Sequence, residues 1–167
     1  MNKKDFRVRV PLWNIAIFAA LAFWAYGGVY AVDMMWNGIE VTVENGEASV
    51  LWNMPALAAA FGGMALLLIV VTAYFIQVIR HNRRNPEKKL GAIYFFKPVE
   101  LLEDDEMVSQ ITNRAAKKVY AFYTSLLPLL VLLMLFPLPR YTFILIVCLG
   151  IMAHNAIIYR EMRRFVS

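Results

Sequence analysis

The sequence has few charged residues and a single cysteine, and both shortages limit what the chain can be. Charged residues make up 17% of the 167 residues, whereas an ordinary soluble domain has about 25%. Hydrophobic residues make up 60%, above the usual range of about 45–50%. The one cysteine, Cys148, excludes an internal disulfide framework. This composition is typical of a membrane protein.

The sequence also lacks the motifs that carry common catalytic or cofactor chemistry. It contains no Gly-rich phosphate loop, no Cys-x-x-Cys and no His-Glu-x-x-His. The long apolar runs contain no Asp, Glu, Lys or Arg, and a proton-coupled transporter normally requires a buried carboxylate. We therefore expect a protein that is not an enzyme and that holds neither a cofactor nor a metal.

Four apolar runs are long enough to cross a membrane as helices. A helix needs about 20 residues to span about 30 Å of hydrocarbon. In lipid only helices and closed barrels satisfy every backbone group, and these runs are continuous rather than alternating. We predict an all-α integral membrane protein with one membrane domain, residues 1–167, built as a four-transmembrane-helix bundle. The expected spans are residues 11–32, 55–80, 117–136 and 141–159.

The distribution of basic residues predicts the orientation. The apolar runs free of charge are residues 10–32, 48–79, 119–139 and 141–159. Of the 17 Lys and Arg residues, 16 lie before the first run, between the second and third runs, or after the fourth, and only Arg140 lies on the other side. Cytoplasmic loops of membrane proteins carry an excess of Lys and Arg. We predict a multi-pass protein of the cell (plasma) membrane with both termini in the cytoplasm. The net charge of +5 then reflects topology and does not indicate a nucleic-acid partner.

The segment between the first two spans, residues 39–52, has the pattern of a β-hairpin. Asn45-Gly46 is a preferred two-residue type I′ turn, flanked by alternating apolar and polar residues. Pairing outward from this turn sets Val41 opposite Val50. We predict a short extracytoplasmic hairpin, and because an isolated hairpin is marginally stable, its apolar face needs cover. The cover is either the lipid interface and the helix ends or a partner protein. The candidate contact residues are Val41, Val50 and Trp52.

The segment between the second and third spans, residues 81–116, is too long for a simple connection. Its aromatic residues Tyr94–Phe96 lie near basic residues, which suits a segment in the headgroup layer. The acidic run Glu103–Glu106 is typical of a helix's first turn rather than of a metal site. We predict a cytoplasmic amphipathic segment, followed by one helix from about residue 104 to residue 135.

A few polar residues near the inner membrane edge are the candidates for a cofactor pocket. Two axial histidines would suit a b-type haem, and the same residues would suit a quinone or metal pocket. The alternative is that one histidine lies in the headgroup layer and a neighbouring helix satisfies the other. No second intramembrane histidine lies at a matching depth, so the sequence favours this alternative. The candidates are His154, His81, Asn155, Gln77 and Asn14.

Small residues recur at four-residue spacing in the second span. The pairs are Ala58 with Gly62 and Ala59 with Gly63. Such pairs let transmembrane helices approach closely. They pack either against the first span within the monomer or against an oligomer or partner.

These features together predict a small non-catalytic integral membrane protein, an accessory or regulatory subunit of a larger membrane complex. One alternative is a homo-oligomeric channel or small-solute transporter. A less favoured alternative is a haem- or quinone-linked redox membrane protein. The expected partners are the lipid bilayer and either another protein or further copies of this chain.

Overall fold

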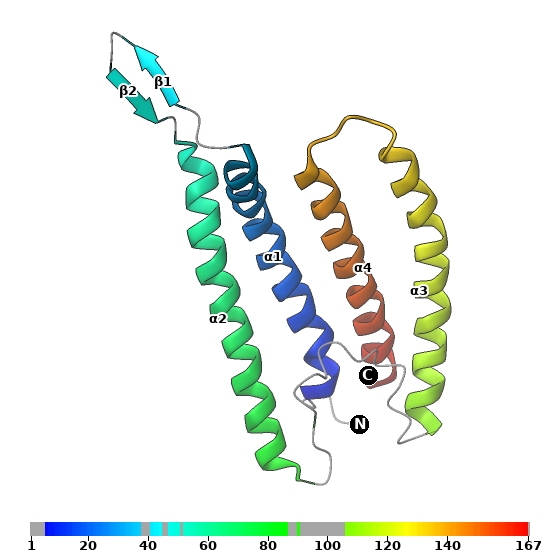
Figure 1. Cartoon of the computed structure of the whole chain (residues 1–167). Coiled ribbons are helices and arrows are strands. Elements are labelled where there is room, and N and C mark those ends of the chain that lie inside the picture. The colour runs from blue at the N-terminus through cyan, green and yellow to red at the C-terminus, as the bar shows by residue number, and fades with distance from the viewer. Residues whose placement is uncertain are drawn as a thin grey trace.

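Four long helices make up most of the structure (Figure 1). The computed structural model describes residues 6–37, 41–44, 47–50, 52–86, 90 and 106–166. All four helices are long and apolar enough to cross a membrane, and the protein is therefore a multi-pass membrane protein. The helices are α1 (Phe6–Asn37), α2 (Met54–Arg84), α3 (Glu106–Leu133) and α4 (Arg140–Val166), and the strands are β1 (Val41–Glu44) and β2 (Glu47–Val50).

The start of α2 is set by its local sequence. The Asn53 side-chain oxygen accepts a hydrogen bond from the backbone N–H of Ala56 at 3.1 Å, which satisfies one of the unpaired donors of the first turn. Pro55 lies in that turn, where its missing N–H costs nothing. The backbone N–H of Asn53 also donates to the Tyr30 hydroxyl of α1 at 3.1 Å. The entry into α2 is therefore tied to the neighbouring helix.

Three of the helices, α1, α2 and α4, extend beyond the expected spans at both ends. The remaining helix, α3, ends before its expected span does. The 32 residues of α1 reach about 48 Å at 1.5 Å per residue, more than the hydrocarbon thickness of about 30 Å. The helix α3 ends at Leu133, three residues before the end of the expected span. Its last turn tightens, because Phe136 N–H donates to the Leu133 carbonyl at 3.1 Å. Pro137 follows and disfavours a helical conformation at the residue before it.

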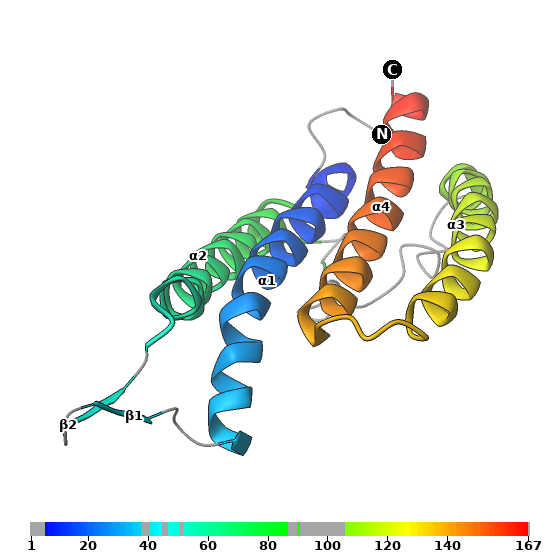
Figure 2. The same cartoon turned by 90° about the horizontal axis from the view of Figure 1, so that it is seen from above.

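The four helices of the predicted bundle lie side by side as an open layer. Among the residues that the structure describes, helix contacts join α2 to α1, α1 to α4, and α4 to α3. Figure 2 shows α1 and α4 in the middle of the layer, with α2 and α3 at its edges. In lipid no hydrophobic force drives apolar helices together, so close surface fit decides which helices become neighbours. Hydrophobicity alone could not predict that α2 and α3 would stay apart.

The contact between α1 and α4 is marked by polar and aromatic pairs along its length. Near the start of α1, the Asn14 amide donates to the Asn155 side-chain oxygen at 3.0 Å. Farther along, the rings of Tyr26 and Tyr141 meet edge to face with centroids 5.3 Å apart. At the far end, Arg140 Nη1 lies 3.0 Å from Asp33 Oδ1. We call this contact the α1–α4 seam.

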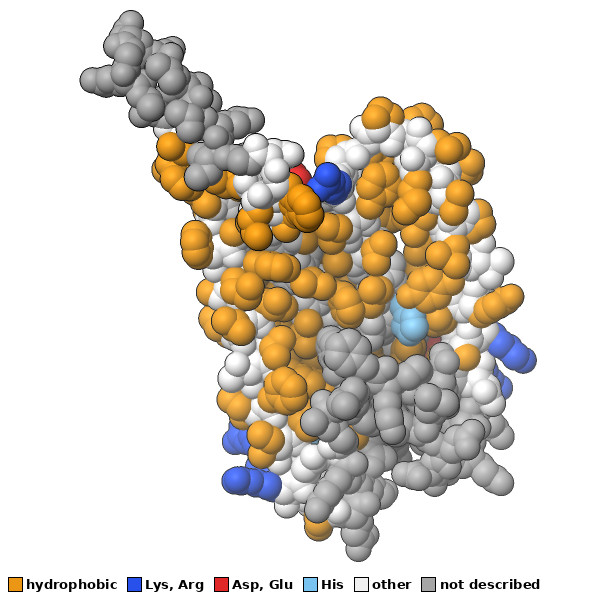
Figure 3. All heavy atoms as spheres, viewed as in Figure 1, with side chains coloured by type: hydrophobic (Ala, Val, Ile, Leu, Met, Phe, Trp, Pro, Cys, Tyr) orange, Lys and Arg blue, Asp and Glu red, His pale blue; other side chains and the backbone are white. Residues whose placement is uncertain are grey.

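The two ends of the layer differ in charge. Hydrophobic side chains cover the helices between the ends, and most of the basic side chains visible in Figure 3 lie at the end away from the hairpin. The beginning of α1 and the end of α4 both lie at this end (Figure 1). We call it the basic end. Its described basic residues are Arg9, Arg80, Arg83, Arg84, Arg114, Lys117, Lys118, Arg160, Arg163 and Arg164.

The strands β1 and β2 pair antiparallel at the opposite end of the layer (Figure 1). Val41 pairs with Val50, the register that the alternating sequence pattern predicts. Val50 and Trp52 are both exposed. The turn residues Asn45 and Gly46 lie outside the described residues, and so does most of the inner segment for which the sequence predicts an amphipathic structure.

The buried apolar side chains gather toward the basic end in two clusters. One joins the start of α1 to α3 and α4, and the other joins α1 to α2 and includes Leu90. The backbone of Leu90 exchanges two hydrogen bonds with the Asn82 side chain, at 2.7 and 2.8 Å. The first cluster contains Val8, Ala115, Val119, Ile158 and Met162. The second contains Val10, Ile17, Tyr74, Val78 and Leu90.

Candidate functional site

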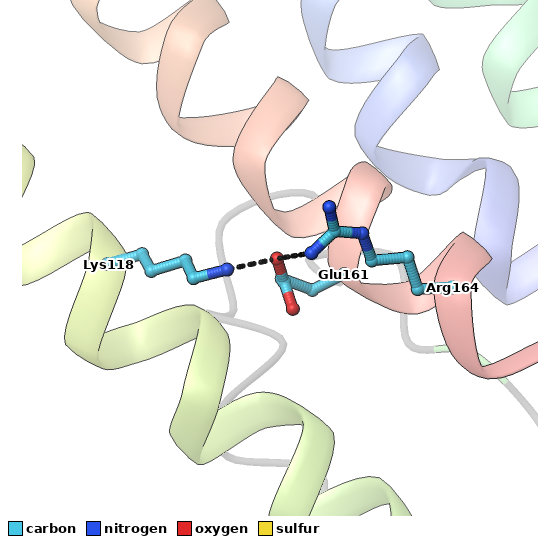
Figure 4. Close-up of polar contacts among 3 residues, drawn as sticks. All are labelled: Lys118, Glu161 and Arg164. Carbon is cyan, nitrogen blue, oxygen red and sulfur yellow. Dashed lines mark hydrogen bonds and ion pairs between the residues drawn. The ribbon is translucent and has the colours of Figure 1, made fainter.

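A buried carboxylate joins α3 to α4 at the basic end. Glu161 of α4 exposes only 5% of its surface. Lys118 of α3 donates a hydrogen bond from Nζ to Glu161 Oε1 at 2.6 Å. Arg164 Nη1 lies 3.6 Å from the same oxygen, as Figure 4 shows. The two cationic side chains are 53% and 56% exposed, so they reach from the surface to a carboxylate that has little access to water.

A cavity of about 220 Å³ opens beside this ion pair. It is lined by Lys118, Ile157, Arg160, Glu161 and Arg164. Three of these side chains are cationic and one is anionic, so the lining carries a net charge of +2. A lining with this net charge favours an anion over a cation.

Helical spacing explains how the sequence builds this cavity. On α4, Ile158 is buried against α3 and Glu161 follows three residues later. Residues three apart on a helix are neighbours on its surface, so Glu161 lies beside the packed stripe and Arg164 lies one further step along. On α3, Ala115 and Val119 are buried, and Lys118 lies at the edge of their stripe. Packing of the apolar residues therefore brings the charged ones together.

This pair is not singled out by the sequence analysis, because its two members are far apart in the chain. Lys118 is bound to a residue 43 positions away. One signal in the sequence could have found the pair. Glu161 is the only acidic residue after Glu106, and it lies among arginines at the end of the fourth span.

Two of the five candidate cofactor residues do meet in the structure. Asn14 and Asn155 form the hydrogen bond of the α1–α4 seam, and the Asn155 amide also donates to the Ile151 carbonyl at 2.9 Å. These two asparagines therefore join α1 to α4 through their side chains, and Asn14 Oδ1 is buried with no hydrogen-bond partner.

The two histidines lie on helices that do not contact each other in the described part of the chain. His154 of α4 has its Nδ1 3.2 Å from the Tyr123 hydroxyl of α3. His81 of α2 has its Nδ1 3.4 Å from the Asn85 amide. Gln77 also lies on α2. Each histidine has its own protein neighbour, and the described residues contain no group of three His, Cys, Asp or Glu residues suited to a metal.

The two small-residue pairs of α2 point in different directions. Ala59 and Gly63 are buried against α1, and a Cβ added at Gly63 would lie 2.6 Å from the Cα of Trp24. Ala58 and Gly62 face outward, and a Cβ added at Gly62 would meet no atom within 4 Å. One pair therefore packs within the monomer, and the other is exposed at the edge of the layer.

No protein-family model, curated protein or solved structure matches this chain. A functional proposal therefore rests on its own residues and contacts.

Proposed function

We propose that this protein is a non-catalytic accessory or regulatory subunit of a larger membrane complex. The observation that carries the proposal is the open helix layer. Within the described residues, α2 at the edge of the layer contacts one other helix. Its outer face is apolar and partly flat, which is the kind of surface that receives a helix of another membrane protein.

The outer face of α2 combines small exposed residues with a large neighbouring side chain. Ala58, Gly62 and Ala65 are exposed along this helix, and Phe61 beside them is 77% exposed. Lipid tails can cover such a face. Small residues also allow the backbone of another helix to approach closely, and this favours association because helices in lipid associate through van der Waals packing. The pair Ala59 and Gly63 of the same helix already packs in this way against α1.

The polar residues inside the helices support a structural role over a catalytic or conducting one. On α3, the Thr124 hydroxyl donates to the Tyr120 carbonyl at 2.8 Å, and the Ser125 hydroxyl donates to the Ala121 carbonyl at 3.2 Å. Hydroxyls that bond to their own helix are suited to a lipid-facing surface. With the asparagine pair in the α1–α4 seam, these side chains are occupied in holding the protein together.

The proposal includes the plasma membrane as the location and the cytoplasm as the side of both termini. The described basic residues gather at the end of the layer where α1 begins and α4 ends, as expected for a cytoplasmic face. Arg140, at the opposite end, is paired with Asp33. Its charge is therefore offset locally, so it opposes this orientation only weakly. The strands β1 and β2 then lie outside the cytoplasm.

The test is purification in a mild detergent, followed by native mass spectrometry. We expect the wild-type chain to copurify with a stoichiometric membrane partner. Gly62→Leu adds a large side chain to this exposed face and should release the partner. Ala121→Leu makes a similar exchange at an exposed position of α3, at the opposite edge of the layer, and should retain it.

Three outcomes would contradict the proposal. A wild-type chain recovered only as a monomer would remove the subunit role. A homo-oligomer without another protein would favour the channel or small-solute transporter instead. If both variants keep the partner, or if both lose it, the outer face of α2 is not the contact surface.

A further inference from the structure

Three cationic side chains surround the cavity beside Glu161. Lys118 and Arg164 both approach the same Glu161 oxygen, and Arg160 lines the cavity with them. All three are exposed over part of their surface, so an anion that enters the cavity can reach them.

The position of the cavity along α4 suits a ligand at the membrane surface. The fourth apolar run ends at Tyr159, and Arg160 is the first charged residue after it. The lining therefore has an apolar side chain, Ile157, about one turn before Arg160 and about two turns before Arg164. An acyl chain can lie along the apolar side while a charged headgroup meets the cations. Basic pockets between transmembrane helices are known to bind anionic headgroups in this way.

The volume of the cavity restricts the size of the ligand. Pockets for drug-sized molecules usually measure about 300–1,000 Å³, and this one measures about 220 Å³. It therefore suits a small anionic group rather than a nucleotide or a cofactor.

We propose that Lys118, Arg160 and Arg164 form a binding site for a phosphate group, carried by an anionic lipid headgroup or by free inorganic phosphate. Arginine and lysine are the side chains that bind phosphate oxygens, through charge-assisted hydrogen bonds. Glu161 does not contact the anion. Its role is to position Lys118 and Arg164, which come from different helices, so that both cations are in place before the phosphate arrives. This proposal is independent of the accessory-subunit role.

The first experiment measures lipid binding by native mass spectrometry of the full chain in mild detergent. The probes are phosphatidylglycerol, which is anionic, and phosphatidylcholine, which carries the same phosphodiester with no net charge. We expect the wild-type chain to retain phosphatidylglycerol in preference to phosphatidylcholine. Arg160→Gln should weaken phosphatidylglycerol binding about fivefold, which corresponds to about 1 kcal/mol for one basic residue near an anionic surface.

Arg163→Gln is the matched control. It removes the same charge from the same turn of α4, but Arg163 does not line the cavity. We expect it to leave binding within about twofold of the wild type, a change of about 0.4 kcal/mol. Equal losses in Arg160→Gln and Arg163→Gln would show attraction to general surface charge and would overturn the proposal.

A second measurement separates the two sources of phosphate. Titration calorimetry with inorganic phosphate tests the free anion, and Lys118→Gln should abolish any heat of binding while Lys118→Arg should retain it. Phosphate binding without a preference for phosphatidylglycerol assigns the site to the free anion. A lipid preference without phosphate binding assigns it to the headgroup. The absence of both would overturn the proposal.

Discussion

Gly63→Ala and Gly62→Ala add the same methyl group to adjacent residues of α2, but only the first methyl meets another helix. At Gly63 the new Cβ would lie 2.6 Å from the Cα of Trp24, which is 0.8 Å short of the 3.4 Å at which ordinary contact begins. The obstructing atom belongs to the backbone of α1, so no side-chain rotation can relieve the clash. The two helices must move apart.

The difference between the two variants isolates the packing cost. An alanine in place of glycine within a helix gains up to about 1 kcal/mol of intrinsic helix propensity, and both variants share this gain. Overfilling a well-packed contact costs about 1–3 kcal/mol, and only Gly63→Ala has this cost. We expect Gly62→Ala to be as stable as the wild type or slightly more stable. Gly63→Ala should be less stable than Gly62→Ala by about 1–3 kcal/mol.

The assay is reversible unfolding by sodium dodecyl sulfate in mixed micelles, followed by tryptophan fluorescence. Trp24 lies at the α1–α2 contact, so separation of these helices changes the environment of an intrinsic probe. Equal unfolding free energies for the two variants, within about 0.5 kcal/mol, would show that α1 does not approach α2 closely at Gly63. The argument for two differently used faces of α2 would then fail.

Two further predictions address the α1–α4 seam and the orientation. Asn155→Leu should lower the free energy of unfolding by about 0.6–2 kcal/mol, the range for hydrogen bonds between transmembrane helices. Adding Asn14→Leu should lower it little further, because Asn14 has already lost its partner. Additive losses in the same unfolding assay would argue against the pairing. In a Cys148→Ala background, a membrane-impermeant maleimide applied to intact cells should label Glu44→Cys and leave Arg84→Cys unlabelled. Labelling of both positions to the same extent would refute the proposed orientation.

The four membrane-crossing helices were predictable from sequence because charge in hydrocarbon is costly. Long runs without Asp, Glu, Lys or Arg are therefore a direct sign of a span, and each expected span overlaps one helix of the structure. The helix ends were less predictable. Outside the hydrocarbon a helix can continue with charged residues, so the end of an apolar run does not mark the end of the helix. The helix α4 runs seven residues past Tyr159, to Val166.

The order of the helices in the layer was not predictable from composition. Ala58, Ala59, Gly62 and Gly63 look equivalent in the sequence, but the helical turn sends one pair toward α1 and the other outward. Which face is used depends on the shape of the partner surface, a property of two helices together. The same limit applies to Lys118, whose ion-pair partner Glu161 lies 43 positions away in the sequence.

The α1–α4 seam has a consequence for how the molecule assembles. The helices α1 and α2 form one antiparallel pair and α3 and α4 form another. Among the described residues, the close contacts between the two pairs run along α1 and α4, and Val8 of α1 also belongs to the buried cluster of α3 and α4. Each half can therefore complete its internal contacts alone, with docking as the last step. A chain divided between α2 and α3 would still hold two matching fragments, and coexpressed fragments should find each other through a single shared boundary.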